Sequence, residues 1–142
     1  MSYATLEQLT TRFGEALLLQ LTDRAQPPAG AIDADVVARA LADTDAAIDG
    51  YLAGRYALPL AETPALLVPI ALAIAIYRLH PYSAEDKIAD DYKMAIADLE
   101  RIAKGTIRLP VAGIEPQGSA ASGVVTIDRE RDFTPENMRG LI

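Results

Sequence analysis

Hydrophobic residues recur at helical spacing along the chain and lose that spacing after Gly105. The clearest case is segment 34–53, where one side of a helix drawn at 100° per residue is apolar and the opposite side is acidic. The apolar side is formed by Val37, Leu41, Thr44, Ile48 and Tyr51. This pattern predicts an amphipathic helix with Asp33 as its N-cap.

The N-terminal segment carries the signals of two short helices. Thr5 and Gln8 have the spacing of a capping box, in which each side chain bonds the other residue's backbone N–H, so a helix is predicted over 6–13. The pattern is then interrupted, and a second short helix is predicted over 15–21. Tandem prolines and a glycine in residues 24–30 predict a loop, because they cannot continue a helix.

Segment 64–79 has almost no polar positions. Pro64 suits the first turn of a helix, and Pro81 stops it. A helix that is apolar nearly all round is either central in a bundle or buried against another subunit. We therefore expect this segment to be a buried helix.

The last helix is predicted to start at Ser83 and to end at Lys104. Ser83 and Asp86 resemble a capping box, while Lys104 followed by Gly105 places a cation in the last turn and a glycine just beyond it. Met94 lies among charged residues on the outer side of this helix and is a candidate contact point.

A block of turn residues lies between the two central helices. Pro59 biases Leu58 away from the helical conformation, so residues 54–60 are predicted to be an extended connection. We expect Arg55 to anchor the crossing by pairing with a carboxylate or with backbone carbonyls, because its planar guanidinium offers several donors. The residues assigned to this structural turn are Gly54, Arg55, Tyr56 and Pro59.

Beyond Gly105 the chain is rich in Gly, Pro and Ser and ends in a cluster of apolar and basic residues. Two short strands are predicted, at 107–109 and 124–127, which would pair with each other or add to a partner's sheet. Because such a composition offers little apolar surface for a core, the segment is predicted to reach a neighbouring molecule. The residues predicted to bind that partner are Val124, Val125, Ile127, Arg131, Phe133, Met138, Arg139 and Leu141.

These patterns together predict an all-α protein. With 142 residues, 51% of them hydrophobic, the chain has the size of one domain and enough apolar material for a core. Residues 1–105 would form a bundle of four to five helices. Residues 106–142 would form an extended C-terminal interaction arm.

The formal net charge of −7 argues against a nucleic-acid-binding surface, because such binding depends on Lys and Arg that neutralise phosphates. An acidic surface can instead line a path along which DNA slides without binding. We hypothesise that the acidic side of the helix predicted over 34–53 faces such a channel through Asp35, Asp45 and Asp49. The alternative is an ordinary solvated helix face.

The sequence contains no convincing catalytic or metal-binding constellation. There is no cysteine, and the single histidine, His80, precedes Pro81 at a helix end, where a capping role is expected. Between Asp23 and Asp35, prolines and alanines occupy positions where Ca²⁺ would need oxygen ligands. We predict no enzymatic activity and no cofactor or metal. The longest uncharged stretch, 63–77, is too short to span a bilayer, so no membrane contact is predicted.

Several blocks of the sequence resemble a family of small virion proteins from Mu-like phages and prophages. The most specific block is Ala47-Ile-Asp-Gly-Tyr-Leu-Ala-Gly-Arg-Tyr-Ala-Leu-Pro-Leu60. Similarity extends through Ile74-Ala-Ile-Tyr-Arg-Leu79, Leu99-Glu-Arg-Ile-Ala-Lys-Gly105 and the terminal Phe133-Thr134 and Met138-Arg-Gly140. The resemblance implies a helical head–tail connector, an adaptor that forms a ring between the portal of a filled capsid and the tail.

The resemblance also implies partners and a location. The partners would be the portal protein, neighbouring copies of the chain, and the next connector or a tail-terminator protein, while genome DNA passes without specific binding. The protein would reside at the head–tail junction of the virion after assembly in the host bacterial cytoplasm. No secretory signal is apparent at the N-terminus, in keeping with that origin.

Two other interpretations stay open at this point. The chain could be a tail-completion or stopper protein of the same virion, or a non-viral helical regulatory adaptor. Sequence alone does not separate these, whereas the order of the flanking genes would. An enzyme is the least favoured class, because no reactive groups converge.

Overall fold

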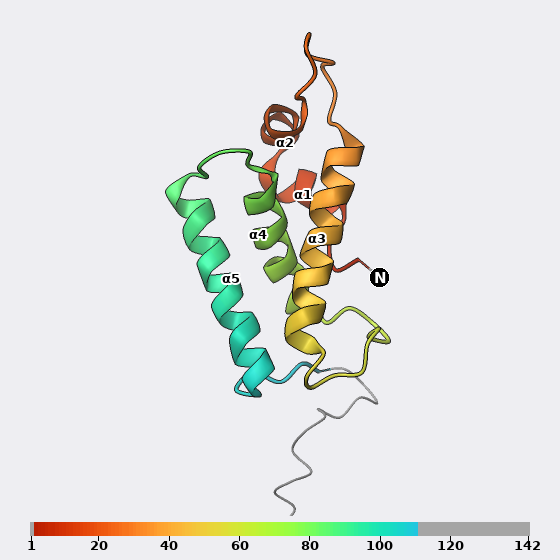
Figure 1. The fold of residues 1–142 in the computed structure, drawn as a ribbon, viewed down its shortest axis with the longest axis vertical. Coiled ribbons are helices and arrows are strands. Elements are labelled where there is room, and N and C mark those ends of the chain that lie inside the picture. Colours follow the sequence, from red (N-terminus) through yellow and green to blue (C-terminus); the bar gives the residue numbers. More distant parts are fainter. Residues whose placement is uncertain (1, 111–142) are drawn as a thin grey trace, which may run out of the picture.

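The computed structural model of the chain describes residues 2–110 (Figure 1). Every regular element in this part is an α-helix, so the all-α fold class that the sequence predicted is confirmed. The helices are α1 (Leu6–Phe13), α2 (Glu15–Thr22), α3 (Ala34–Leu52), α4 (Leu67–Leu79) and α5 (Asp86–Lys104).

Helix α4 lies between α3 and α5 and packs against both (Figure 1). Eight of its 13 residues are buried, so most of its nearly uniform apolar surface is covered within one chain. Ile74 is fully buried, as are Ile48 of α3 and Leu99 and Ile102 of α5. The prediction that segment 64–79 is a buried helix, central in the bundle, is therefore confirmed.

Two tyrosines of the central helices lie at the edge of this core. Tyr51 and Tyr77 are only half-buried. The ring of Tyr77 stacks on that of Tyr92, with centroids 4.0 Å apart and planes 9° from parallel. This pair closes the seam between α4 and α5 with aromatic surface.

Local signals place the two N-terminal helices as predicted. Gln8 donates its backbone N–H to the Thr5 hydroxyl (3.2 Å), and Thr5 donates its own to the Gln8 side chain (3.0 Å), so the capping box forms. Gly14 has a φ of 92°, a conformation that residues with a Cβ rarely adopt. This glycine separates α1 from α2 and lets the chain change direction.

Residues 23–33 form a loop that is fastened at both ends. The Asp23 carboxylate accepts the backbone N–H groups of Ala29 (2.9 Å) and Gly30 (2.8 Å), and these bonds lower the pKa of Asp23. The buried hydroxyl of Thr22 accepts the N–H of Asp33 (3.1 Å), which is itself the N-cap of α3, as predicted. The loop therefore holds α2 against the start of α3.

Two predicted helix starts are wrong. Helix α4 begins at Leu67 instead of residue 64, because Pro64 lies in a preceding turn in which Leu67 donates its N–H to the Pro64 carbonyl (3.0 Å). Helix α5 begins at Asp86 after Glu85, which makes no side-chain cap bond. Ser83 is exposed and outside the helix, so the predicted capping box does not form.

The strand predicted at 107–109 is also wrong. Gly105 ends α5 with a φ of 82°, and Thr106 and Ile107 both donate N–H groups back to the Arg101 carbonyl (2.9 and 3.2 Å). Leu109 then donates its N–H to the Tyr56 hydroxyl (3.0 Å) and buries its side chain. Apolar and polar residues do alternate over 107–109, but the apolar side chains pack on the helical body. The body therefore extends to Leu109.

Within residues 2–110, every helix is too short or too polar to cross a lipid bilayer.

Candidate partner-binding groove

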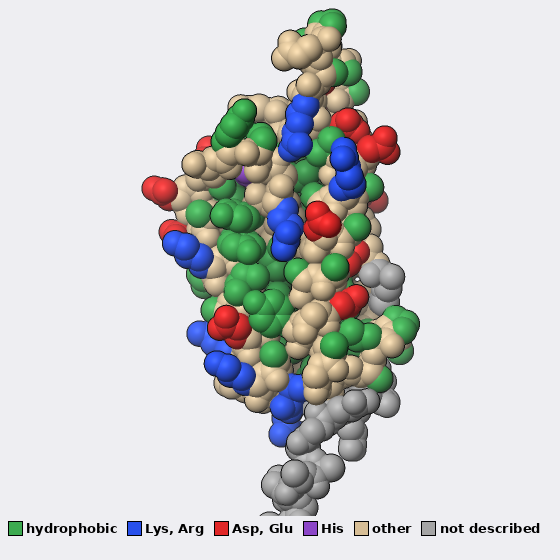
Figure 2. All heavy atoms as spheres, viewed as in Figure 1, with side chains coloured by type: hydrophobic (Ala, Val, Ile, Leu, Met, Phe, Trp, Pro, Cys, Tyr) green, Lys and Arg blue, Asp and Glu red, His purple; other side chains and the backbone are tan. Residues whose placement is uncertain are grey.

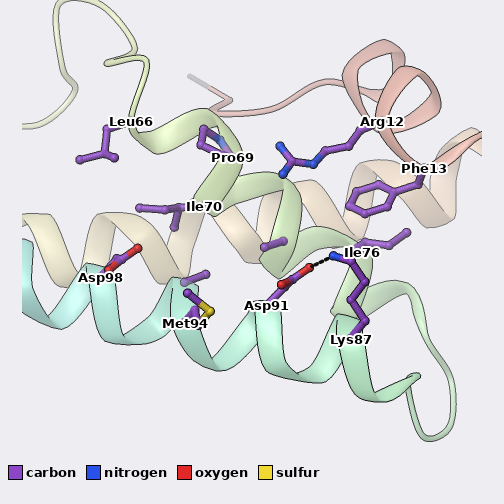
Figure 3. Close-up of a pocket in the computed structure, with 12 residues that line it drawn as sticks. Arg12, Phe13, Leu66, Pro69, Ile70, Ile76, Lys87, Asp91, Met94 and Asp98 are labelled. Carbon is purple, nitrogen blue, oxygen red and sulfur yellow. Dashed lines mark hydrogen bonds and ion pairs between the residues drawn. The ribbon is translucent and has the colours of Figure 1, made fainter.

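A concave surface among the described residues lies between α1, α4 and α5 (Figure 3). We call it the α1/α4/α5 groove, and it has a volume of about 290 Å³. Its floor comes from one face of α4 through Ile70, Ala73 and Ile76, and α5 adds Ala95. These residues share a face because they recur three or four positions apart. The floor is therefore apolar along its length.

Helix α1 closes one end of this groove. Phe13, its last residue, points toward α4 and α5, and Arg12 extends over the rim beside it (Figure 3). Helix α1 ends here because the chain turns at Gly14. The Phe13 side chain therefore covers the end of the groove. Arg12 forms no ion pair with a carboxylate of residues 2–110.

Large apolar side chains are exposed at this groove. Met94 of α5 is 67% exposed and Leu66, just before α4, is 38% exposed. The one other large hydrophobic side chain exposed in the described part of the chain is Tyr82, away from the groove. Exposed apolar side chains that gather on one concave surface mark a binding site more often than scattered ones do. The prediction that Met94 is exposed is confirmed.

Charged residues form the α5 side of the rim. Lys87 pairs with Asp91 (2.8 Å), and Asp98 pairs with Arg101 (2.8 Å). These pairs are largely exposed, so each contributes little to stability and can exchange its partner at small cost. An apolar floor with mixed charges along its edge is suited to binding a peptide segment.

The groove offers no set of groups suited to catalysis. No cluster of three or more His, Asp or Glu side chains that could hold a metal ion occurs in the described residues. His80 is the C-cap residue of α4, and its Nδ1 lies 2.8 Å from the Ile76 carbonyl oxygen, a contact in which it can only be the donor. The capping role predicted for His80 is therefore confirmed.

The acidic residues of α3 differ in their surroundings. Asp35 is exposed, but Asp45 accepts the backbone N–H of Tyr3 (3.0 Å) and Asp49 accepts the Tyr3 hydroxyl. Burial, together with the hydrogen bond to the Asp49 carboxylate, raises the pKa of Tyr3. Two of the three carboxylates thus hold the N-terminus on α3. Their exposure to a DNA channel stays a prediction.

The predicted turn block positions the start of the arm. Tyr56 is buried, and its hydroxyl holds Leu109, while the guanidinium of Arg55 lies against Gly105 so closely that a Cβ there would be 2.5 Å from it. Within residues 2–110 no carboxylate is within ion-pair distance of Arg55, and its Nε is buried without a hydrogen-bond partner. The pairing predicted for Arg55 therefore stays a prediction. Gly54 and Pro59 are exposed on the connection between α3 and α4.

A second hollow, of about 230 Å³, lies where α2, α3 and α4 meet, and Arg24, Arg39 and Arg78 line it. Figure 2 shows Lys and Arg side chains near this end of the molecule, above hydrophobic side chains that gather between α3 and α5. Arg24 is engaged in the fold, because it donates to the carbonyls of Leu21 (3.2 Å) and Leu79 (3.1 Å). Arg24 in this hollow therefore joins the end of α2 to the end of α4.

The residues predicted to bind a partner through the arm lie outside the described residues. They are Val124, Val125, Ile127, Arg131, Phe133, Met138, Arg139 and Leu141. The strand predicted at 124–127 lies there as well. For these residues the sequence predictions stand untested.

Sequence reasoning found Met94 but missed the other parts of the groove. Phe13 and Leu66 read as ordinary members of apolar helix faces, and only the tertiary arrangement leaves space between them. The sequence nevertheless held one signal of the groove. Pro69 and Ala73, which line it, have short side chains that leave space beside α4.

Comparison with known proteins shows close relatives. Residues 3–127 match the family described as "Bacteriophage Mu, Gp36". The chain is 35% identical over 123 residues to the Mu-like prophage FluMu protein gp36 of Haemophilus influenzae, with 87% of this chain and 86% of that protein covered. It is 36% identical over 105 residues to gene product J of Escherichia phage Mu, with 74% of each chain covered.

Proposed function

Because the chain belongs to the Bacteriophage Mu, Gp36 family, as its sequence resemblance predicted, we propose that it is a head–tail connector subunit of a Mu-like phage particle. In this proposal, copies form a ring between the portal of a filled capsid and the tail. The ring is part of the virion and assembles in the host bacterial cytoplasm. The observation that carries the proposal is the family match over residues 3–127, which takes in the whole helical body and continues into the arm.

The surface of the body supports a role in binding instead of catalysis. Its concave site is an apolar groove with a charged rim, the combination found at protein interfaces. A ring subunit needs contacts with two neighbours, with the portal on one side and with the next connector or a tail-terminator protein on the other. One body with several distinct surfaces can supply them.

The arm supplies the longer-range contacts in this proposal. Residues 124–127 have the β-branched composition that adds to the edge of a partner's sheet, and we assign them to the portal. The more distal Phe133, Met138 and Leu141 act as apolar anchors, with Arg131 and Arg139 beside them. Ordering such an arm costs entropy, so its contacts form on assembly.

Genome DNA passes through this ring without specific binding. The net charge of −7 disfavours retention of a polyanion. Of the three carboxylates predicted to face the channel, Asp35, Asp45 and Asp49, only Asp35 is exposed. We therefore place Asp35 nearest the channel.

The test is a phage-producing strain in which the gene carries an early stop codon. We expect electron micrographs of its lysate to show filled heads and separate tails, because the junction cannot form. Full-length protein supplied from a plasmid should restore infectious particles, whereas protein that ends at Pro110 should not.

The site of incorporation separates the alternatives. In a strain that cannot make tails, a connector copurifies with filled heads. A tail-completion protein copurifies instead with tails from a strain that cannot make heads. Normal particle yield without the protein would show that the proposed role is wrong.

A further inference from the structure

From the groove and the sequence of the arm we infer that the α1/α4/α5 groove of one copy receives residues 131–142 of the neighbouring copy. This inference deepens the proposed function and rests on its ring arrangement, because it names the surface through which adjacent subunits join. Residues 124–127 are left free for the portal.

The groove has the features of a receptor for an apolar segment. Met94 and Leu66 are exposed on opposite walls, and Phe13 closes one end. An occupant that covers these side chains removes apolar surface from water on both partners. Residues 131–142 are suited to this, because they contain Phe133, Met138, Leu141 and Ile142.

The spacing of anchors in the segment matches the length of the groove. Lys87 and Asp98 mark its two ends on α5, and at 1.5 Å per residue they are about 16 Å apart along the helix. Phe133 and Met138 are separated by about the same distance along an extended chain. Pro135 favours an extended conformation in the residue before it. Both anchors can therefore occupy the groove together.

The rim charges select one direction for the segment. Figure 3 shows Asp98 at one end of the groove, and Arg12 and Lys87 toward the other. With Phe133 at the Asp98 end, Arg131 approaches Asp98, and Glu136 approaches the two cations. Asp98 exchanges its exposed partner on α5 at little cost.

In this direction Met138 reaches the end of the groove that Phe13 closes. A thioether beside an aromatic ring is a favourable contact. A methionine is therefore a suitable anchor for that end of the groove.

The length of the tether allows the segment to reach the next subunit. Residues 111–130 lie between the described body and the segment and extend to about 66 Å at most, more than twice the length of α5, about 28 Å. The donor segment and the acceptor groove are different surfaces of one chain. A contact of this kind is heterologous, and repeated around an axis it closes a ring.

Disulfide formation between full-length chains tests this contact, and the chain has no cysteine of its own. One copy carries Met94→Cys, and the other, with a tag that changes its size, carries Thr134→Cys, because Met94 lies one helical turn from Asp98 and therefore opposite the residue that follows Phe133. Under mild oxidation we expect the mixed dimer to form at least about tenfold faster than between Tyr82→Cys and Thr134→Cys, because docking raises the local thiol concentration. Tyr82 is 90% exposed, so by random collision alone the control pair would form a disulfide faster than the pair that contains Met94→Cys.

Charge reversal tests the direction of the segment. Asp98→Lys or Arg131→Glu alone should slow formation of the mixed dimer, and the two together should restore it. Asp98 lies on the rim, so charge reversal there leaves the core intact. Equal rates in all four combinations would contradict the contact.

Two further outcomes overturn the inference. Rapid closure within one chain that carries both Met94→Cys and Thr134→Cys would show that the segment docks on its own body. A rate no faster than the control, both in purified protein and in assembled particles, would show that the groove does not receive it. If particles still require the protein in that case, the connector role stands and only this contact is wrong.

Discussion

At the scale of single residues, polar contacts between distant positions fasten the ends of the helical body. Tyr3 bonds Asp45 and Asp49 of α3, and Tyr56 holds the backbone of Leu109. These tyrosines bury their rings and satisfy their hydroxyls, an arrangement that adds both apolar burial and a hydrogen bond. The two ends of the body are thus held by side chains.

Replacing Tyr3 with Phe should lower the free energy of unfolding by about 1–2 kcal/mol at pH 7, because a partly buried carboxylate loses its donor. The pKa of Tyr3 is raised in the fold, so the stability from its neutral hydroxyl is present below about pH 10 and is lost as the pH rises further. Urea unfolding should therefore show a smaller difference between Tyr3→Phe and the wild type at pH 11 than at pH 7.

The matched control is Tyr82→Phe, since Tyr82 is exposed. Its stability should equal that of the wild type at pH 7. A loss as large as that of Tyr3→Phe would mean that the measured effect does not come from the bond to Asp49.

At the scale of elements, two glycines in or beside helices should respond to alanine in opposite directions. Gly105 has a positive φ and lies against Arg55, so Gly105→Ala should destabilise by about 1–2 kcal/mol. Gly50 lies within α3 with open space around it, so Gly50→Ala should stabilise by about 0.5–1 kcal/mol. Thermal melts of both variants measure this, and shifts of the same sign would contradict the described end of α5.

Helix α4 has a core side and a groove side that should respond differently to truncation. Ile74→Ala should cost about 2–5 kcal/mol, because it leaves a cavity among fully buried side chains. Leu66→Ala, at the exposed wall of the groove, should change stability by less than about 0.5 kcal/mol. Chemical denaturation of the two variants decides this, and equal losses would show that the groove wall belongs to the core.

At the scale of the whole molecule, the helical body should fold without the arm, and residues 106–109 should add to the stability of that body. A chain that ends at Pro110 keeps the core, including Leu109 and its bond to Tyr56. A chain that ends at Gly105 loses these contacts and should be less stable by about 1.5–3 kcal/mol, the value of burying a Leu side chain. Calorimetry should show one cooperative transition in both. Equal stability would place the end of the body at Gly105.

The sequence by itself determined the elements whose signals are local. The capping box at Thr5, the N-cap at Asp33 and the glycine after Lys104 act within one turn of helix, so each could be predicted without knowledge of the fold. The apolar surface of α4 likewise predicted its central position. The start of α5 was mispredicted because Ser83 offers a cap that the chain does not use.

Only the tertiary structure decided which side chains meet across the body. The partner of Tyr3 lies more than 40 residues away, and the partner of Leu109 more than 50, so no local pattern encodes either contact. The α1/α4/α5 groove has the same origin, because Phe13 and Leu66 look like ordinary apolar residues until three helices leave space between them. Periodicity fixes which face of a helix is apolar. Packing decides whether a neighbour covers it or leaves it open to a partner.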